Sequence, residues 1–195
     1  DRMHRENPAS LIKFQGFNLL NRATLGLGAG ELMVVGGQTS SGKSTLLCCL
    51  AKGLLAGGRR VGIVSLEDSV FIWYDRLISG ASGIGISRLR SSDLDKKDEA
   101  VMIETASKLG LDRLFIEYVG SCKTSEVINK MVSRVATGKS DIVFVDYLQQ
   151  IHDADVRGRH PEISNALGKM KRAAADLNVP IVVVTQLSRE GLREG

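Results

Sequence analysis

The sequence contains few cysteines and no hydrophobic run long enough to cross a membrane. Its three cysteines are Cys48, Cys49 and Cys122, a spacing that fits neither a disulfide framework nor a metal site. We expect buried thiols in a reducing compartment. The apolar runs fall short of the roughly 18 residues that a membrane-spanning helix needs, and the first residues do not resemble a cleavable leader. These absences predict a cytoplasmic protein with no membrane partner.

The composition predicts a single globular domain. The chain has 195 residues, of which 43% are hydrophobic and 25% are charged. Residues 1–13 are polar and irregular and are expected to form a linker or arm, which leaves residues 14–195 as one domain. The net charge of +4 is compatible with a polyanionic partner but does not by itself demand one. The lack of an initiator Met predicts an excised fragment.

Short runs rich in Val and Ile alternate with longer segments of helical period, a pattern typical of repeated βα units. The runs have almost no polar alternation, as expected for strands that helices cover on both faces. The fold class is therefore predicted to be α/β, with a mostly parallel twisted sheet and helices on both sides. The expected strands are residues 31–36, 61–66, 113–118, 141–145 and 179–185.

Five helices are expected between these strands, at residues 43–56, 70–79, 93–109, 124–135 and 161–177. Gly57 and Gly110 follow two of them and are expected to take the left-handed conformation that often ends a helix. Pro161 suits the first turn of the last helix.

A phosphate-binding loop is the clearest motif in the chain. Residues 37–44 satisfy G-x-x-x-x-G-K-[S/T] between an expected strand and an expected helix. Backbone N–H groups of such a loop point at phosphate oxygens, Lys43 would reach the β and γ phosphates, and the Ser44 hydroxyl would bind Mg²⁺. The motif predicts a site for ATP and Mg²⁺. The expected nucleotide-binding residues are Gly37, Gln38, Thr39, Ser40, Ser41, Gly42, Lys43, Ser44 and Thr45.

Two acidic residues at strand ends could complete this site. Asp146 ends the apolar run DIVFVD, the usual place for the carboxylate that holds the magnesium shell. Glu67 ends VGIVSLE and is the candidate base that orients the attacking water. Asp68 is the alternative base, because strand alternation turns neighbouring side chains to opposite sides and only one can face the nucleotide.

A polar residue also ends the last expected strand. Gln186 follows IVVVT, and its amide can donate and accept hydrogen bonds near a γ phosphate. Such a residue can sense hydrolysis. An ordinary strand-end glutamine bonded to the backbone is the alternative.

Four segments together resemble one family of motor proteins. They are residues 16–32, with Gly16-Phe17 and Thr24-Leu25-Gly26-Leu27; VSLEDS followed by Arg76-Leu77; DIVFVDYLQ; and LNVPIVVVTQLSR. The last two are the most specific. Over residues 16–195 the chain resembles the DnaB family of hexameric replicative helicases, including the related phage helicases.

This resemblance implies roles for individual residues. Glu67 becomes the catalytic glutamate, Asp146 the magnesium carboxylate, Gln186 the link between the γ phosphate and the DNA-facing loops, and Arg76 a further polar contributor near the site. It also implies a RecA-like fold and a homohexameric ring that moves 5′–3′ along single-stranded DNA. ATP is then hydrolysed between subunits, and a primase or helicase loader is a further partner.

The resemblance further implies two loops that face the channel of the ring. They correspond to residues 152–160 and to the stretch after Gln186. Their arginines are candidates for contacts to backbone phosphates, which need positive charge and no base reading. A solvated basic loop is the alternative. The candidates are Arg157, Arg159, Arg189 and Arg193.

The chain also departs from the family pattern. After Q-L-S-R the family runs through a longer loop to an L-R-E-S-G segment and then to strands that carry an arginine finger, whereas here GLREG follows almost at once. We therefore expect a motor domain truncated at its C-terminus, without the arginine finger or the N-terminal primase-binding domain. Two alternatives remain: a RecA-, RadA- or KaiC-like ATPase in recombination or signalling, against which D-Y-L-Q and Q-L-S-R argue, and a nucleotide-switched assembly or loader module.

Overall fold

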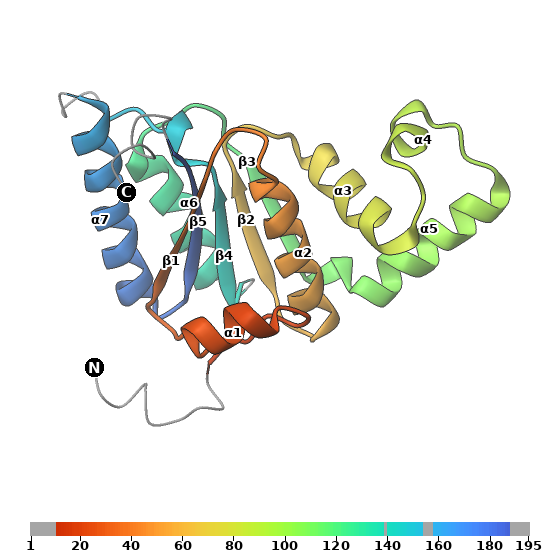
Figure 1. Ribbon diagram of the computed structural model, residues 1–195, viewed down its shortest axis with the longest axis horizontal. Coiled ribbons are helices and arrows are strands. Elements are labelled where there is room, and N and C mark those ends of the chain that lie inside the picture. Colours follow the sequence, from red (N-terminus) through yellow and green to blue (C-terminus); the bar gives the residue numbers. More distant parts are fainter. Residues whose placement is uncertain (1–10, 139, 154–157, 188–195) are drawn as a thin grey trace.

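The computed structural model describes residues 11–138, 140–153 and 158–187, and alternates strands with helices along the chain (Figure 1). The strands are β1 (Leu32–Gly37), β2 (Val61–Ser65), β3 (Leu114–Tyr118), β4 (Ile142–Asp146) and β5 (Ile181–Gln186). The helices are α1 (Asn18–Thr24), α2 (Lys43–Ala56), α3 (Val70–Ser82), α4 (Ile86–Ser91), α5 (Lys96–Leu109), α6 (Thr124–Ala136) and α7 (Arg159–Leu177). Two 3₁₀ turns, η3 (Leu111–Arg113) and η4 (Leu148–Gln150), complete the set. None of the helices described is long and apolar enough to cross a membrane.

The five strands form one parallel sheet in the order β1-β5-β4-β2-β3, which confirms the predicted strands and fold class. The register places Gly37 beside Gln186, and Ser65 beside Asp146. All the strands therefore end at the same edge of the sheet, the upper edge in Figure 1. Ligands of open α/β sheets bind beyond this edge, so the register alone brings the candidate residues into one region.

Helices cover both faces of the sheet, as the apolar strand runs predict. On β4, Ile142 and Phe144 pack with α2 and α3, while Val143 and Val145 pack with α6 and α7. The same alternation runs through β2 and β5, since successive side chains of a strand point to opposite faces. Two hydrophobic cores hold the sheet rigidly between them, and α2 and α3 lie on the opposite side from α6 and α7 in Figure 1.

Two helices were not expected from the sequence. The seven-residue α1 has no buried residue and exposes 81% of Leu19, so its sequence lacks the apolar stripe that would predict a helix. A side chain anchors it instead: Asn21 accepts a hydrogen bond from the Phe14 N–H at 2.8 Å and donates to the Phe14 carbonyl at 2.7 Å. The six-residue α4 is likewise without buried residues. Short helices of this kind depend on particular tertiary contacts.

Helix ends differ from the predictions at several places: α3 continues to Ser82, beyond the expected residue 79, and α7 begins at Arg159, two residues before Pro161. Residues 93–109 were expected to form one helix, but α5 begins at Lys96 because the Asp95 carboxylate accepts the Asp98 N–H and caps it. Gly57 was expected to be left-handed, which is wrong: its φ is −79°, and Gly58 takes the positive φ of 81°. Gly110 is left-handed as predicted, with φ of 67°.

The segment before α1 also packs on the domain. Ile12, which was predicted to lie in the arm, exchanges backbone hydrogen bonds with Leu27 at 2.9 and 2.8 Å and is 5% exposed.

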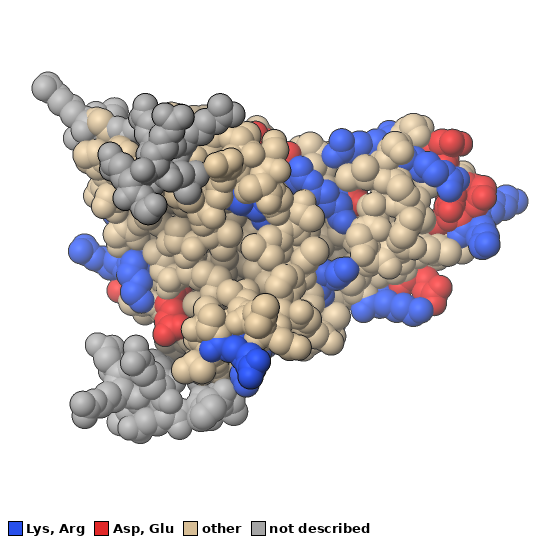
Figure 2. Space-filling view, viewed as in Figure 1, with Lys and Arg blue, Asp and Glu red and all other residues tan. Residues whose placement is uncertain are grey.

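The helices α4 and α5 lie at the end of the molecule away from α7, on the right of Figure 1, and charges of both signs gather there (Figure 2). An ion pair between Arg88 and Asp98 joins the two helices there, and Lys108 pairs with Glu104 on the surface of α5.

Candidate nucleotide site

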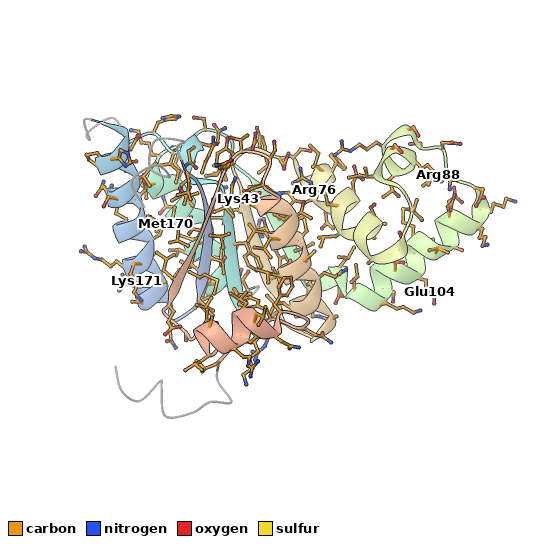
Figure 3. The ribbon with its side chains drawn as sticks, in the orientation of Figure 1. Lys43, Arg76, Arg88, Glu104, Met170 and Lys171 are labelled. Carbon is orange, nitrogen blue, oxygen red and sulfur yellow. The ribbon has the colours of Figure 1, made fainter. Side chains whose placement is uncertain are left out.

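A pocket of about 290 Å³ opens at the edge of the sheet where the strands end. Figure 3 shows Lys43 and Arg76 at this edge. The structure thus brings together every residue proposed for catalysis or metal binding, while Gly37, Gln38 and Ser41 belong to the loop behind the pocket. The lining residues are Thr39, Ser40, Gly42, Lys43, Ser44, Thr45, Glu67, Arg76, Asp146, Tyr147 and Gln186.

The loop between β1 and α2 has the backbone of a phosphate cradle. Gly42 has φ of 86°, a left-handed conformation that glycine tolerates best, and it directly precedes the first turn of α2. A Cβ on Gly37 would stand 2.6 Å from the Ser41 Oγ, so a larger residue there would force the Ser41 side chain to move. The Lys43 ammonium donates to the Gln38 carbonyl at 2.6 Å. These features hold a cation and the N-terminus of a 14-residue helix at the mouth of the pocket, which favours anions.

Asp146 is a buried carboxylate, 3% exposed, with one oxygen that has no partner among the described residues. Its side chain is hydrogen-bonded to Ser44, and the oxygen left over is Oδ1. Burial raises the pKa of Asp146, and the nearby charges of Asp68 and Glu67 add to this, against the Ser44 hydrogen bond and Arg76. A buried anion with a free oxygen fits a divalent cation, so Asp146 and Ser44 can hold Mg²⁺.

Replacing Asp146 by asparagine should therefore have opposite effects on stability and on activity. The raised pKa means that the ionised carboxylate, the form present at neutral pH, is disfavoured in the folded protein without metal. We expect the Asp146→Asn protein to unfold at a higher urea concentration in EDTA at neutral pH, and its ATP turnover with Mg²⁺ to fall by about two orders of magnitude. The gain in stability should vanish below about pH 4, where wild-type Asp146 is protonated both folded and unfolded. Lower stability in EDTA at neutral pH would contradict this assignment.

The two acidic residues after β2 have different surroundings, but both lie in the bend that follows Ser65 and not in the strand. Strand alternation, on which the prediction rested, therefore does not set their directions. Glu67 is exposed and lines the pocket. Asp68 instead forms an ion pair with Arg76 of α3, nine residues beyond Glu67. Glu67 is therefore the one of the two that lines the pocket, while Asp68 pairs with the guanidinium of a second lining residue, Arg76.

Ser65 and Trp73 position this turn. The Ser65 hydroxyl donates to the Asp68 carbonyl at 2.6 Å and accepts from the Trp73 indole N–H at 3.0 Å, and the Ser65 and Trp73 side chains are fully buried.

Trp73→Phe removes the indole donor and leaves a small cavity, so the free energy of unfolding should fall by about 2 kcal/mol. Urea denaturation followed by circular dichroism measures it. Phe71→Leu on the same helix is the control, because Phe71 is 79% exposed; equal losses in the two variants would contradict the assignment.

Gln186 connects the end of β5 to the phosphate loop. Its side-chain amide donates to the Thr39 Oγ1 at 2.5 Å, and the next N–H, of Leu187, donates to the Gly37 carbonyl at 3.1 Å. The side chain thus contacts the loop itself, which an ordinary strand-end glutamine would not do. A change in the conformation of the phosphate loop would therefore alter hydrogen bonds made by the end of β5.

Tyr147 and Gln149 have functional positions that the sequence analysis did not assign. Tyr147 lines the pocket, and Gln149 donates to Thr185 and to Gln186. Both lie within the D-Y-L-Q segment, and their membership of that motif is the one feature of the sequence that could have predicted them.

The arginines proposed to contact DNA stay predictions. Arg157, Arg189 and Arg193 lie outside the described residues, as does the side chain of Arg159.

Comparison with known proteins decides the family. The model of the DnaB-like helicase C terminal domain matches residues 14–193. The chain belongs to this family. A "Probable plasmid replicative DNA helicase" of Chlamydia trachomatis is 29% identical over 165 residues, covering 84% of this chain and 37% of that protein. The "Replicative DNA helicase DnaB" of Helicobacter pylori is 28% identical over 177 residues, covering 89% and 36%.

Solved structures agree on the fold of this DnaB-like domain. One of them, described as an ATPase domain, superposes with a TM-score of 0.76 at 22% identity, over 91% of this chain and 64% of that one. "The Structure Of A DnaB-Like Replicative Helicase And Its Interactions With Primase" gives 0.76 at 23% identity, over 91% and 44%. The chain spans little more than a third of the length of the curated relatives given above.

Proposed function

We propose that this chain is the ATP-hydrolysing motor of a replicative DNA helicase. One observation carries the proposal: a glycine loop with its lysine, a buried carboxylate bonded to Ser44 and an exposed glutamate line one pocket at the edge of a parallel sheet. Membership of the DnaB-like family and the names of the two relatives support DNA as the polymer along which the motor moves.

Six of the lining residues have a defined task in this proposal. The loop N–H groups and Lys43 bind the phosphates of ATP, and Ser44 with Asp146 hold Mg²⁺. A bound Mg²⁺ supplies positive charge against the phosphate oxygens. Glu67 orients a water for in-line attack on the γ phosphate and takes up its proton. Arg76 stabilises negative charge at the rim, and Gln186 reports the state of the phosphate site to the end of β5.

The wider assembly is also a proposal. A homohexameric ring moving 5′–3′ on single-stranded DNA, in the cytoplasm, would place ATP between subunits and the arginines at positions 157, 159, 189 and 193 against the DNA backbone. The net charge of +4 supports a polyanionic partner. A primase or loader is a further partner, supported by the primase interaction named for one structural neighbour.

The test measures ATP turnover with and without single-stranded DNA, and strand displacement on a forked duplex, in the full-length protein. A helicase motor should show DNA-stimulated turnover and should open the fork. Stimulated turnover without fork opening would favour a recombination-type ATPase. Turnover that DNA does not change would contradict a DNA motor.

A further inference from the structure

A single side chain ties the end of β5 to the turn that follows β4. Gln149, in η4, donates from its amide nitrogen to the Thr185 Oγ1 at 3.0 Å and to the Gln186 backbone carbonyl at 2.8 Å. It therefore holds two consecutive residues at the point where β5 leaves the sheet. One of them is the residue that contacts the phosphate loop.

The orientation of the Gln149 amide is fixed by chemistry. The Gln186 carbonyl can only accept a hydrogen bond, so the NH₂ group must face it; the reverse orientation would place two oxygens together. The amide oxygen of Gln149 is left buried without a hydrogen bond among the described residues. Burying an unpaired oxygen costs free energy, and the two hydrogen bonds of the amide nitrogen offset part of that cost.

Gln149 also belongs to a segment, residues 148–153, that is hydrogen-bonded to the residues just before α6. Residues 148–153 run beside the start of α6: the Cys122 N–H donates to the Gln150 carbonyl at 3.2 Å, and the His152 N–H donates to the Cys122 carbonyl at 2.9 Å. These two bonds attach the segment to the residues that lead into α6.

Asp153 closes the segment with a buried carboxylate, 8% exposed. It accepts from the Thr124 N–H at 2.9 Å, from the Thr124 hydroxyl at 2.8 Å and from the Lys169 ammonium at 3.0 Å. The carboxylate thus joins the segment to both α6 and α7. The segment that contains Gln149 is therefore bonded to two helices.

We propose that Gln149 is the positioning residue that couples Gln186 to the 148–153 segment, and through it links the phosphate site to DNA-stimulated hydrolysis. The described bonds form a continuous series: Thr39 in the phosphate loop, Gln186 at the end of β5, then Gln149 in η4. The inference rests on the proposed function, since it concerns how that activity is regulated. Gln149 does not line the phosphate pocket, so it acts through Gln186 and not on the nucleotide.

Gln149→Leu in the full-length protein tests the coupling. Nucleotide affinity, measured with a fluorescent ATP analogue, and turnover without DNA should stay within about twofold of wild type. Stimulation of turnover by single-stranded DNA should fall about tenfold, a change typical of a lost coupling between sites. The tightening of DNA binding by a non-hydrolysable ATP analogue, followed by fluorescence anisotropy, should be lost as well. Gln149→Glu should behave like Gln149→Leu, because it also removes both donors.

Two further variants separate coupling from folding. Gln150→Leu is the matched control. Among the described residues, the Gln150 amide makes a single 3.5 Å contact within its own turn, to Tyr147, so its stimulation should match wild type. Thr185→Val removes one of the two acceptors, so it should lower stimulation about threefold and add little to Gln149→Leu. Wild-type stimulation in Gln149→Leu, or an equal loss of basal and stimulated turnover, would overturn the proposal. A wild-type protein without stimulation would instead refute the proposed function.

Discussion

Replacing Glu67 by glutamine is expected to lower ATP turnover by about a thousandfold while nucleotide affinity stays within about threefold. Glutamine keeps the size of the side chain but cannot accept a proton, and general base catalysis contributes about 10²–10⁴ in rate. Glu67 lines the pocket and is exposed, so its loss should not disturb packing. Steady-state turnover and binding of a fluorescent ATP analogue together measure the two effects.

Asp68→Asn is the matched control for Glu67. Its carboxylate pairs with Arg76, so the substitution should loosen that arginine and slow turnover by less than about tenfold. If Asp68→Asn abolished turnover and Glu67→Gln did not, the two assignments would have to be exchanged. Unchanged turnover in both variants would instead favour a nucleotide-switched assembly module over a motor.

Lys43→Ala should weaken ATP binding about 10- to 100-fold and lower turnover by about three orders of magnitude. The substitution removes a charge-assisted contact to phosphate in the bound state and charge stabilisation during phosphoryl transfer. Within the described part of the chain Lys43 bonds to its own loop, at the Gln38 carbonyl, so folding should be preserved. Calorimetric titration with ATP and a turnover assay measure the two losses.

Lys171→Ala provides the control for a general loss of positive charge. Lys171 lies on α7, far from Lys43 in Figure 3, and donates to the Gly30 carbonyl. Its substitution should leave ATP affinity unchanged. Equal weakening in the two variants would show that overall charge, and not the loop lysine, governs binding.

The sheet and much of the candidate site could be predicted from the sequence, because both depend on local patterns. A strand buried on both faces is a continuous apolar run, as in residues 141–145, and a glycine loop between a strand and a helix has few structural alternatives. Parallel strands bring their carboxyl ends to one edge, so Asp146 and Glu67 could be placed near Lys43 without coordinates. The structure then separated Glu67 from Asp68 through the Arg76 ion pair.

What the sequence did not reveal depends on contacts between distant elements. The helix α1 is anchored by Asn21, and α4 is a single short helix, so neither carries an apolar stripe. The role of Gln149 arises from a hydrogen bond to a residue 37 positions away. No spacing rule predicts such a bond, because it forms only once β4 and β5 lie side by side.

A crystal structure of the protein with Mg²⁺ and a non-hydrolysable ATP analogue would show where the nucleotide binds. We expect the triphosphate in the loop of residues 37–44, with the γ phosphate against Lys43 and Gln186, the metal beside Ser44 and Asp146, and a water between Glu67 and the γ phosphate. A nucleotide bound elsewhere on the domain, or a γ phosphate turned away from Glu67, would contradict this expectation.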